Sequence, residues 1–394
     1  MWNLSKIHLC GRCRRQLPKF STNRRLMNED LSNVPKDNQK VTSIYKKEGF
    51  FHSKTLLARQ LHDNIVFNDS KKTGLIVVNK PFGLPLLPGE TEDVSLTCAL
   101  PQLASYLNVP NISVIKSSGK FISGCTLLNS GGERTLKHVT KCMARNRANR
   151  KLWTKYLAIT NGIPRNSGVL ETVDVSLETI KTKKSLKGGT YKEPVIRREL
   201  VPSTKIREGK AYGKNRETNS VQMNRVSVVA DILARSRGNL TALVSIQPTG
   251  IEWNFICAYM ANLLSPIIGD SQFSYRVKTI LGNPVKVAHE NSPIGQNINN
   301  LPRLLLGQLG VNPADEIYLP VHLHHFRTHL PGFFGQEDLN IYAALPKYFV
   351  NSANSLEINI NYKELETSDK ILENSFARRK ERKNYNSKKA LSDH

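Results

Sequence analysis

The apolar positions of this chain fall into short runs that are typical of buried strands. Residues 75–78 (Leu-Ile-Val-Val) form one such run, and Pro81 and Gly83 end it. Runs of the same kind predict further strands at 155–160, 225–230 and 240–246. Asn161-Gly162 follows the run at 155–160, and this pair favours a turn. We therefore expect several strands spread over most of the chain.

Apolar positions at helical spacing appear between these strands. Four leucine and isoleucine residues between 56 and 65 recur at the spacing of a helix face, which predicts a short helix before the first strand. Residues 134–148 predict a basic helix, because lysine and arginine recur there at four-residue spacing. A third helix is predicted from Ile256 to Leu264.

The charge of the chain changes this picture, because it indicates a partner. A length of 394 residues suits one large domain or two small ones. The 57 lysines and arginines outnumber the 32 acidic residues, so the formal net charge is +25. Such an excess favours a polyanion, and nucleic acid is the first candidate. The alternative is that basic termini supply much of this charge.

The N-terminus resembles a targeting segment. Residues 1–28 contain seven basic residues and no acidic one, which is typical of a mitochondrial transit peptide. A basic arm that binds RNA is the alternative. Residues 29–55 are polar and predict a linker. Every apolar run of transmembrane length is interrupted by Asn, Pro or Ser, so we expect no membrane span. The transit-peptide composition predicts a location in the mitochondrial matrix.

Two later segments are also basic. Residues 181–225 hold thirteen lysines and arginines against four acidic residues, with little apolar periodicity, which predicts a basic surface insertion between strands. Residues 351–394 predict a basic C-terminal tail, because arginine and lysine cluster near its end. The folded domain is then expected to span residues 56–350.

Cysteine and histidine give little support for a metal or a cofactor. Cys10-Gly-Arg-Cys13 lies in the presumed leader and lacks a second ligand pair, and the other four of the six cysteines are scattered. A histidine group at 322, 324, 325 and 329 has no cysteine or acidic ligands with it. We therefore expect no metal site and no cofactor.

Five motifs occur in a fixed order between about residues 60 and 335. The first two are Gly74-Leu-Ile-Val-Val-Asn-Lys-Pro-Phe-Gly-Leu-Pro85 and Val114-Ile-Lys-Ser-Ser-Gly-Lys-Phe-Ile-Ser-Gly-Cys-Thr-Leu-Leu128. The others are Lys155-Tyr-Leu-Ala-Ile-Thr-Asn-Gly162, then Thr249-Gly250 with Pro266-Ile-Ile-Gly-Asp270, and last Val321-His-Leu323 with Pro331. Together they resemble the RluA-type pseudouridine synthases.

The resemblance implies a fold and a reaction. The fold is α+β, with a long, mixed, mostly antiparallel sheet, flanking helices and a central cleft. The family isomerises uridine in RNA, for which the base must leave the stack. In the family an Asp acts on the sugar, an Arg pairs with that Asp, and a Tyr stacks on the base. Tyr156 matches the Tyr, although a tyrosine on a strand is also a common core residue.

The family's charged pair is missing from this chain. Gly119 stands where the family has its Asp, and residues 94–132 contain no Asp or Glu. Residues 238–275 contain no Lys or Arg, so either alignment of the Thr-Gly motif leaves the Arg positions without a basic residue. Losing both partners of a buried pair is tolerated far better than losing one. Ser117, Ser118 or Glu252 would have to replace the Asp, and neither serine has an evident activating base.

RNA binding has broader support in the sequence. We expect the following basic residues to contact RNA phosphates: Lys80, Lys116, Lys120, Arg134, Lys137, Lys141, Arg145, Arg147, Arg150 and Lys151. The alternative is a solvated helix face. Two hypotheses follow. The chain acts on uridines of mitochondrial mRNA or rRNA, or it is a catalytically silent RNA chaperone or mitochondrial ribosome assembly factor. Proteins of the mitochondrial RNA granule or of ribosome assembly are its expected partners.

Overall fold

The computed structural model describes residues 45–46, 51, 53–89, 94–148, 152–181, 190–197, 223–287 and 301–365. The predicted leader, most of the predicted linker and the end of the predicted basic tail lie outside these ranges. Within them, no helix is both long and apolar enough to cross a bilayer.

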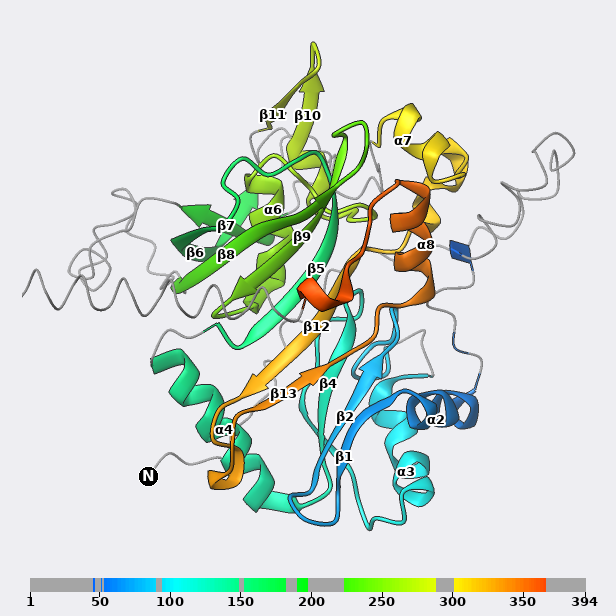
Figure 1. Cartoon of the computed structure of the whole chain (residues 1–394), viewed down its shortest axis with the longest axis vertical. Helices are drawn as coiled ribbons and strands as arrows, with labels where there is room; N and C mark the ends of the chain where they lie inside the picture. Colours follow the sequence, from blue (N-terminus) through cyan, green and yellow to red (C-terminus); the bar gives the residue numbers. More distant parts are fainter. Residues whose placement is uncertain are drawn as a thin grey trace, which may run out of the picture.

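One long sheet of eleven strands organises the described residues (Figure 1). Nine strands follow the order β1-β2-β4-β12-β5-β9-β8-β6-β7, while β3 pairs with β4 and β13 with β12. The two remaining strands, β10 and β11, form a separate hairpin. The strands are β1 (Ile65–Asp69), β2 (Leu75–Lys80), β3 (Ser113–Lys116), β4 (Ser123–Asn129), β5 (Thr154–Asn161), β6 (Val169–Lys181), β7 (Thr190–Arg197), β8 (Met223–Arg235), β9 (Thr241–Pro248), β10 (Val277–Ile280), β11 (Asn283–Lys286), β12 (Leu323–Leu330) and β13 (Leu339–Tyr342).

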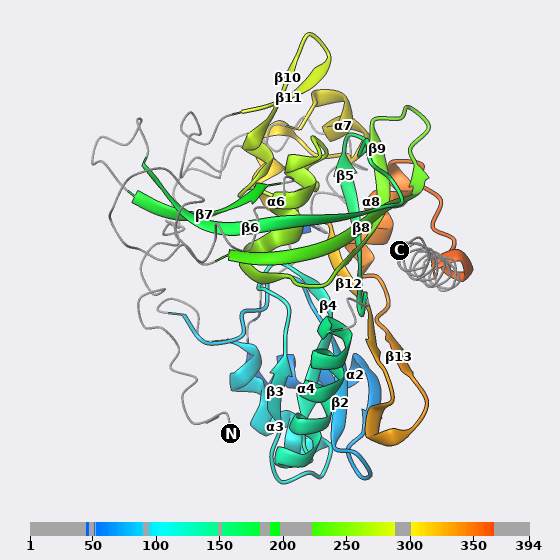
Figure 2. The same cartoon turned by 90° about the vertical axis from the view of Figure 1, so that its left-hand side faces the viewer.

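Helices cover both faces of one half of this sheet, since β2 is apolar on both sides. Ile76 and Val78 face α2 (Lys54–Asp63) and α3 (Leu96–Tyr106), whereas Leu75 and Val77 face α4 (Gly132–Ala148). Figures 1 and 2 show α4 on one side of these strands and the α2–α3 pair on the other. This packing explains the continuous apolar run that predicted the strand.

The other half of the sheet is covered in the same way. Alternate residues of β5 enter two different cores. Tyr156 and Ala158 pack with α6 (Phe255–Asn262), while Leu157 and Ile159 pack with α7 (Arg303–Gln308) and α8 (Lys347–Ser355). The predicted strands at 155–160, 225–230 and 240–246, and the predicted helix near 256–264, are therefore confirmed.

A parallel pairing joins the two halves of the sheet. β4 and β12 run parallel, with Ser123 beside His324 and Gly124 beside His325. Every other strand pair of this sheet among the described residues is antiparallel. Gly124 has φ 112°, and a Cβ there would overlap the His325 carbonyl. Only glycine fits this crossing, which gives a physical reason for the Ser-Gly of the second motif.

Three predicted boundaries need correction. The segment 181–225, expected to be an insertion without strands, contains β7, which pairs with β6 at the sheet edge. The domain does not end at residue 350, because Leu356, Ile358 and Leu365 are buried in the core beside α8. Tyr45 of the predicted linker is buried too, and its hydroxyl lies 2.9 Å from that of Ser352.

Substituting Gly124 with Ala tests whether the β4–β12 crossing needs glycine. Gly282 is a matched control, because it also has a positive φ (79°) but its Cβ would have nothing within 4 Å. We expect Gly124→Ala to lower the free energy of unfolding by about 1–3 kcal/mol more than Gly282→Ala does. Both variants place alanine at a positive φ, but only the methyl group at residue 124 overlaps the His325 carbonyl. Urea unfolding of both variants measures the difference. Equal losses would show that the crossing accommodates a methyl group.

Candidate functional site

The turn between β3 and β4, residues 117–122, lies at the centre of the candidate site. It carries the segment in which the family has its Asp. Two backbone hydrogen bonds fix it: Ile122 N donates to Gly119 O (3.1 Å), and Gly83 N donates to Lys120 O (2.9 Å). The second bond ties the turn to the Lys-Pro-Phe-Gly-Leu-Pro segment after β2. The first two motifs therefore meet in space.

Lys80 of the first motif requires a correction. We expected it to contact RNA phosphates, but its side chain is buried. Its Nζ donates to the carbonyls of Pro81 (3.3 Å), Leu84 (3.2 Å) and Lys120 (3.4 Å). Burial lowers the pKa of this amine to about 7. Lys80 thus holds the two motif segments together and does not present its charge to solvent.

Gly119 faces Asn254, the residue that precedes α6. A Cβ on Gly119 would lie 4.0 Å from Asn254 Oδ1, with no other described atom that close. Asn254 precedes α6 with a left-handed backbone (φ 56°), and its Nδ2 donates to Gln272 Oε1 at 2.9 Å. The position of the family's Asp therefore has room for a side chain, and an amide is its nearest neighbour.

Tyr156 lies beneath this turn. Its ring stacks on that of His325, with the centroids 4.5 Å apart and the planes at 16°, and its side chain is fully buried. Burial raises the pKa of its hydroxyl. That hydroxyl makes no hydrogen bond of normal geometry in the described structure, although the Ser118 side chain is close enough to interact with it. Contact with a uracil base would require residues that cover the buried Tyr156 ring to move, so the base-stacking role stays a prediction.

Ser118 and His325 do not form a nucleophile–base pair. Ser118 Oγ lies 3.4 Å from His325 Nδ1, but that nitrogen is closer to the Cys125 carbonyl, at 2.9 Å. The short contact to a carbonyl assigns the proton to Nδ1, and Nε2 then accepts from Thr328 Oγ1 at 3.1 Å. Burial lowers the pKa of His325 to about 3. A neutral ring with both nitrogens engaged cannot take a proton from Ser118.

Two carboxylates lie close in sequence to Asn254 and to its hydrogen-bond partner Gln272. Glu252, in the 3₁₀ turn Glu252–Asn254, is exposed, and its charge is close enough to raise the pKa of Tyr156. Asp270 is buried, and its Oδ1 accepts from the backbone N–H groups of Gln272 (2.9 Å) and Phe273 (3.2 Å). Its Oδ2 has no hydrogen-bond partner of normal geometry in the described structure, although the Cys257 thiol interacts with the carboxyl group. Burial raises the pKa of Asp270 to about 6.

The basic residues form two groups. Beside the turn, Lys116 Nζ lies 4.2 Å from the centroid of the Trp153 ring, and Lys120 Nζ lies 5.5 Å from that of Phe121. The predicted residues on α4 are exposed, namely Arg134, Lys137, Lys141 and Arg145. Lys137 pairs with Glu133 at 2.8 Å. Arg150, Lys151 and the side chain of Arg147 lie outside the described part of the chain.

The histidine group belongs to the core. His322, His324 and His325 are buried, and burial lowers the pKa of the first two to about 4. His322 Nε2 lies 2.6 Å from Ser352 Oγ, and His324 Nδ1 lies 2.9 Å from Ser123 Oγ. The described residues contain no group of three or more acidic, cysteine or histidine side chains arranged to hold a metal.

Sequence reasoning missed Asn254 and His325, which the fold brings to Gly119 and Tyr156. His325 was grouped with its neighbours as a metal candidate, because the sequence does not reveal that its strand runs beside Tyr156. Asn254 follows the Thr-Gly motif by only a few residues, and that spacing was the one available signal.

The fold built around this turn is that of a solved RNA pseudouridylate synthase domain. A solved structure, "Human RNA Pseudouridylate Synthase Domain Containing 4", matches with a TM-score of 0.54 and 23% identity, covering 78% of this chain and 98% of that chain. This likeness confirms the expected α+β fold. No family model matches the chain.

Similar sequences show the family. "Mitochondrial mRNA pseudouridine synthase RPUSD3" is 31% identical in Bos taurus over 292 residues, covering 73% of this chain and 76% of the relative. The Homo sapiens protein of that name is 30% identical, covering 74% of this chain and 76% of the relative. "Pseudouridylate synthase RPUSD4, mitochondrial" of Danio rerio is 29% identical, covering 79% of this chain and 78% of the relative. The chain belongs to the RluA-type pseudouridine synthase family.

Asp270 predicts a pH dependence of stability. Its folded-state pKa, about 6, lies above the usual 3.8, so the folded protein holds this proton more tightly than the unfolded chain. The contribution of Asp270 to the free energy of unfolding is therefore fully present below about pH 4. It falls by about 3 kcal/mol as the pH rises through about 6. Asp270→Asn keeps the Oδ1 acceptor and cannot ionise.

Urea unfolding of wild type and Asp270→Asn between about pH 4 and pH 7 measures this effect. We expect wild type to lose stability relative to the variant as the pH rises, because the other titrating groups are shared and cancel in the difference. A difference that stays constant over this range would mean that Asp270 ionises normally in the folded protein.

Proposed function

We propose that this protein binds RNA in the mitochondrial matrix and does not isomerise uridine by the carboxylate mechanism of its family. The observation that carries the proposal is Gly119 at the position of the family's Asp, facing the amide of Asn254. The carboxylate-free stretch from 94 to 132 and the stretch from 238 to 275 without Lys or Arg support it. Similarity to mitochondrial mRNA pseudouridine synthases and the Arg-rich start support mitochondrial RNA as the partner.

The site suits RNA binding even without the Asp. Lys116 at the end of β3 and Lys120 in the turn lie on either side of Gly119 in the sequence, and α4 adds a row of exposed basic residues. Such side chains bind backbone phosphates with an affinity that falls as salt rises. In this role the protein is an RNA chaperone or a ribosome assembly factor for mitochondrial mRNA or rRNA. Its partners are proteins of the RNA granule or of ribosome assembly, and its RNA-binding domain spans about residues 56–365.

Glu252 supports a second candidate, an isomerase that uses a displaced carboxylate. Glu252 lies two residues before Asn254, and its charge is felt at Tyr156. In this version a uridine above Tyr156 would be attacked by Glu252 in place of the missing Asp. Exposure of Glu252 to solvent and the lack of a Lys or Arg between 238 and 275 weigh against this version, because the family pairs its carboxylate with an Arg.

Mass spectrometry of digested RNA tests the chemistry. The full-length protein is incubated with transcripts of mitochondrial mRNA and rRNA, and pseudouridine is measured for wild type, Glu252→Gln and a reaction without protein. We expect no pseudouridine above the protein-free level, because loss of a catalytic nucleophile typically costs on the order of 10⁶ in rate. Pseudouridine from wild type that Glu252→Gln abolishes would establish the second candidate. Pseudouridine from both proteins would contradict both candidates.

The salt dependence of RNA affinity tests the binding residues. The double variant Lys116→Ala with Lys120→Ala should reduce the slope of log affinity against log salt by about 1.4, at about 0.7 per phosphate contact for single-stranded RNA. Lys80→Met serves as the control: it removes a lysine of the same region whose amine is buried against carbonyls, so its slope should equal that of wild type. A slope lowered by Lys80→Met, or unchanged in the double variant, would refute this assignment.

A further inference from the structure

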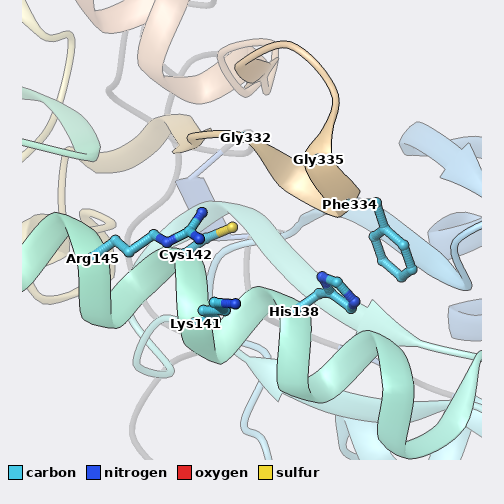
Figure 3. Close-up of a pocket in the computed structure, with 7 residues that line it drawn as sticks. All are labelled: His138, Lys141, Cys142, Arg145, Gly332, Phe334 and Gly335. Atoms are coloured by element: carbon cyan, nitrogen blue, oxygen red, sulfur yellow. The ribbon is translucent and has the colours of Figure 1, made fainter.

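A second basic site lies away from the turn, between α4 and the connection from β12 to β13. His138, Lys141, Cys142 and Arg145 recur at helical spacing on α4 and line a cavity of about 270 Å³. Its other wall is the β12–β13 turn, residues 331–335, which contributes Gly332, Phe334 and Gly335. Figure 3 shows the α4 side chains arrayed along the helix opposite the turn, with Phe334 beside His138.

The aromatic side chains of this pocket are arranged for stacking. The Phe334 and His138 rings are parallel within 17°, with their centroids 4.0 Å apart. The Arg134 guanidinium lies 5.3 Å from the centroid of the Phe334 ring. Phe334 is only half-buried, so part of a large apolar ring reaches the surface among cations. Flat, apolar and positively charged surfaces of this kind suit nucleobases.

The backbone of the turn is unusual at Phe334. This residue has φ 56° and ψ 23°, in the left-handed region, between Gly332 (φ 54°) and Gly335 (φ 78°). A bulky residue rarely adopts this conformation, and such residues cluster at functional sites. The turn is nevertheless anchored, because Gly332 N donates to Asp338 Oδ1 at 2.9 Å and Phe333 is buried below it. The fold therefore holds Phe334 in a conformation that glycine would adopt more easily.

The charges of the pocket favour an anion. Lys141 and Arg145 line it and are exposed, while Arg134 extends the same helix face. The nearby carboxylate, Asp338, accepts from Gly332 N and lies 3.5 Å from His329 Nε2. Cys142 is buried, and its thiol donates to the Pro331 carbonyl at 3.2 Å. Two cations beside an aromatic stack match one phosphate and one base, which is the chemistry of a nucleotide in a single strand.

The position of the pocket fits an RNA strand that also occupies the turn. Along β12, five residues lead from His325, which stacks on Tyr156, to Leu330, which immediately precedes the β12–β13 turn. Five residues of strand span roughly 17 Å. A few nucleotides bridge such a distance, so one RNA could reach both places.

We infer that the pocket between α4 and the β12–β13 turn binds one unpaired nucleotide of the RNA. Its base stacks on the Phe334–His138 pair, and its phosphate contacts Lys141 and Arg145. This inference rests on the proposed RNA binding. It adds a recognition site, remote from Gly119, that requires single-stranded RNA.

The experiment measures fluorescence anisotropy of a labelled short oligouridylate with the full chain at fixed salt. Phe334→Leu keeps apolar volume but removes the stack, and should weaken binding roughly tenfold. Lys141→Ala with Arg145→Ala should weaken it and reduce the salt slope by about 0.7 for the one phosphate. Arg59→Ala is the matched control, because Arg59 is an exposed cation of α2, which packs on the opposite face of β2 from α4, and it does not line the pocket. This variant should bind RNA like wild type.

Phe334→Gly separates function from folding. Glycine relieves the left-handed backbone, so this variant should unfold at a higher temperature than Phe334→Leu and yet bind RNA as weakly. An oligouridylate with abasic positions supplies the reverse test, since it should bind wild type weakly and be insensitive to Phe334→Leu. Wild-type affinity in Phe334→Leu and in the double lysine–arginine variant would overturn the pocket while leaving RNA binding intact. A wild-type protein that binds no RNA would instead refute the proposed function.

Discussion

The parallel pairing of β4 with β12 is the constraint on which the rest of the structure depends. It joins strands about 200 residues apart in the sequence and links the two halves of the sheet. The close approach requires glycine at Gly124 and places His325 against both Tyr156 and Ser118. The 117–122 turn is therefore fixed by backbone and core contacts, and none of these contacts needs a carboxylate at residue 119.

This independence is the physical basis of our proposal that the fold persists without the charged pair of its family. A buried carboxylate without its cation would be strongly destabilising, whereas loss of both leaves nothing unpaired. Asp270 shows what a carboxylate costs in this protein: buried, without an ion-pair partner of normal geometry in the described structure, it has its pKa raised to about 6. Among the described residues, the Asn254 amide is the nearest neighbour of a Cβ at Gly119, and no comparable cost arises there. On our proposal that Gly119 replaces the family's Asp, the site keeps its scaffold and its basic surroundings without its central acid.

Elements with strong apolar periodicity could be predicted from the sequence, and those held together by polar contacts could not. β2, β5, β8, β9 and α6 were found because each buries a regular set of apolar residues, whereas α4 was found from basic residues at four-residue spacing. β12 was missed, since its buried histidines depend on hydrogen bonds to distant residues such as Ser123 and Cys125. β7 was missed because it is an edge strand in a basic segment. Lys80 was misassigned for a related reason: lysine is usually exposed, and only the meeting of two loops reveals its three carbonyl partners.

The measurement that tests the central claim most directly is a pseudouridine map of mitochondrial RNA from cells that lack this protein, compared with cells rescued by the wild-type chain, together with the amounts of the RNAs that it binds. If the protein binds RNA without isomerising it, its loss changes the abundance or assembly of bound RNAs and leaves every pseudouridine in place. A uridine whose modification disappears with the protein, returns with the wild-type chain and is also formed by the purified protein would contradict this account.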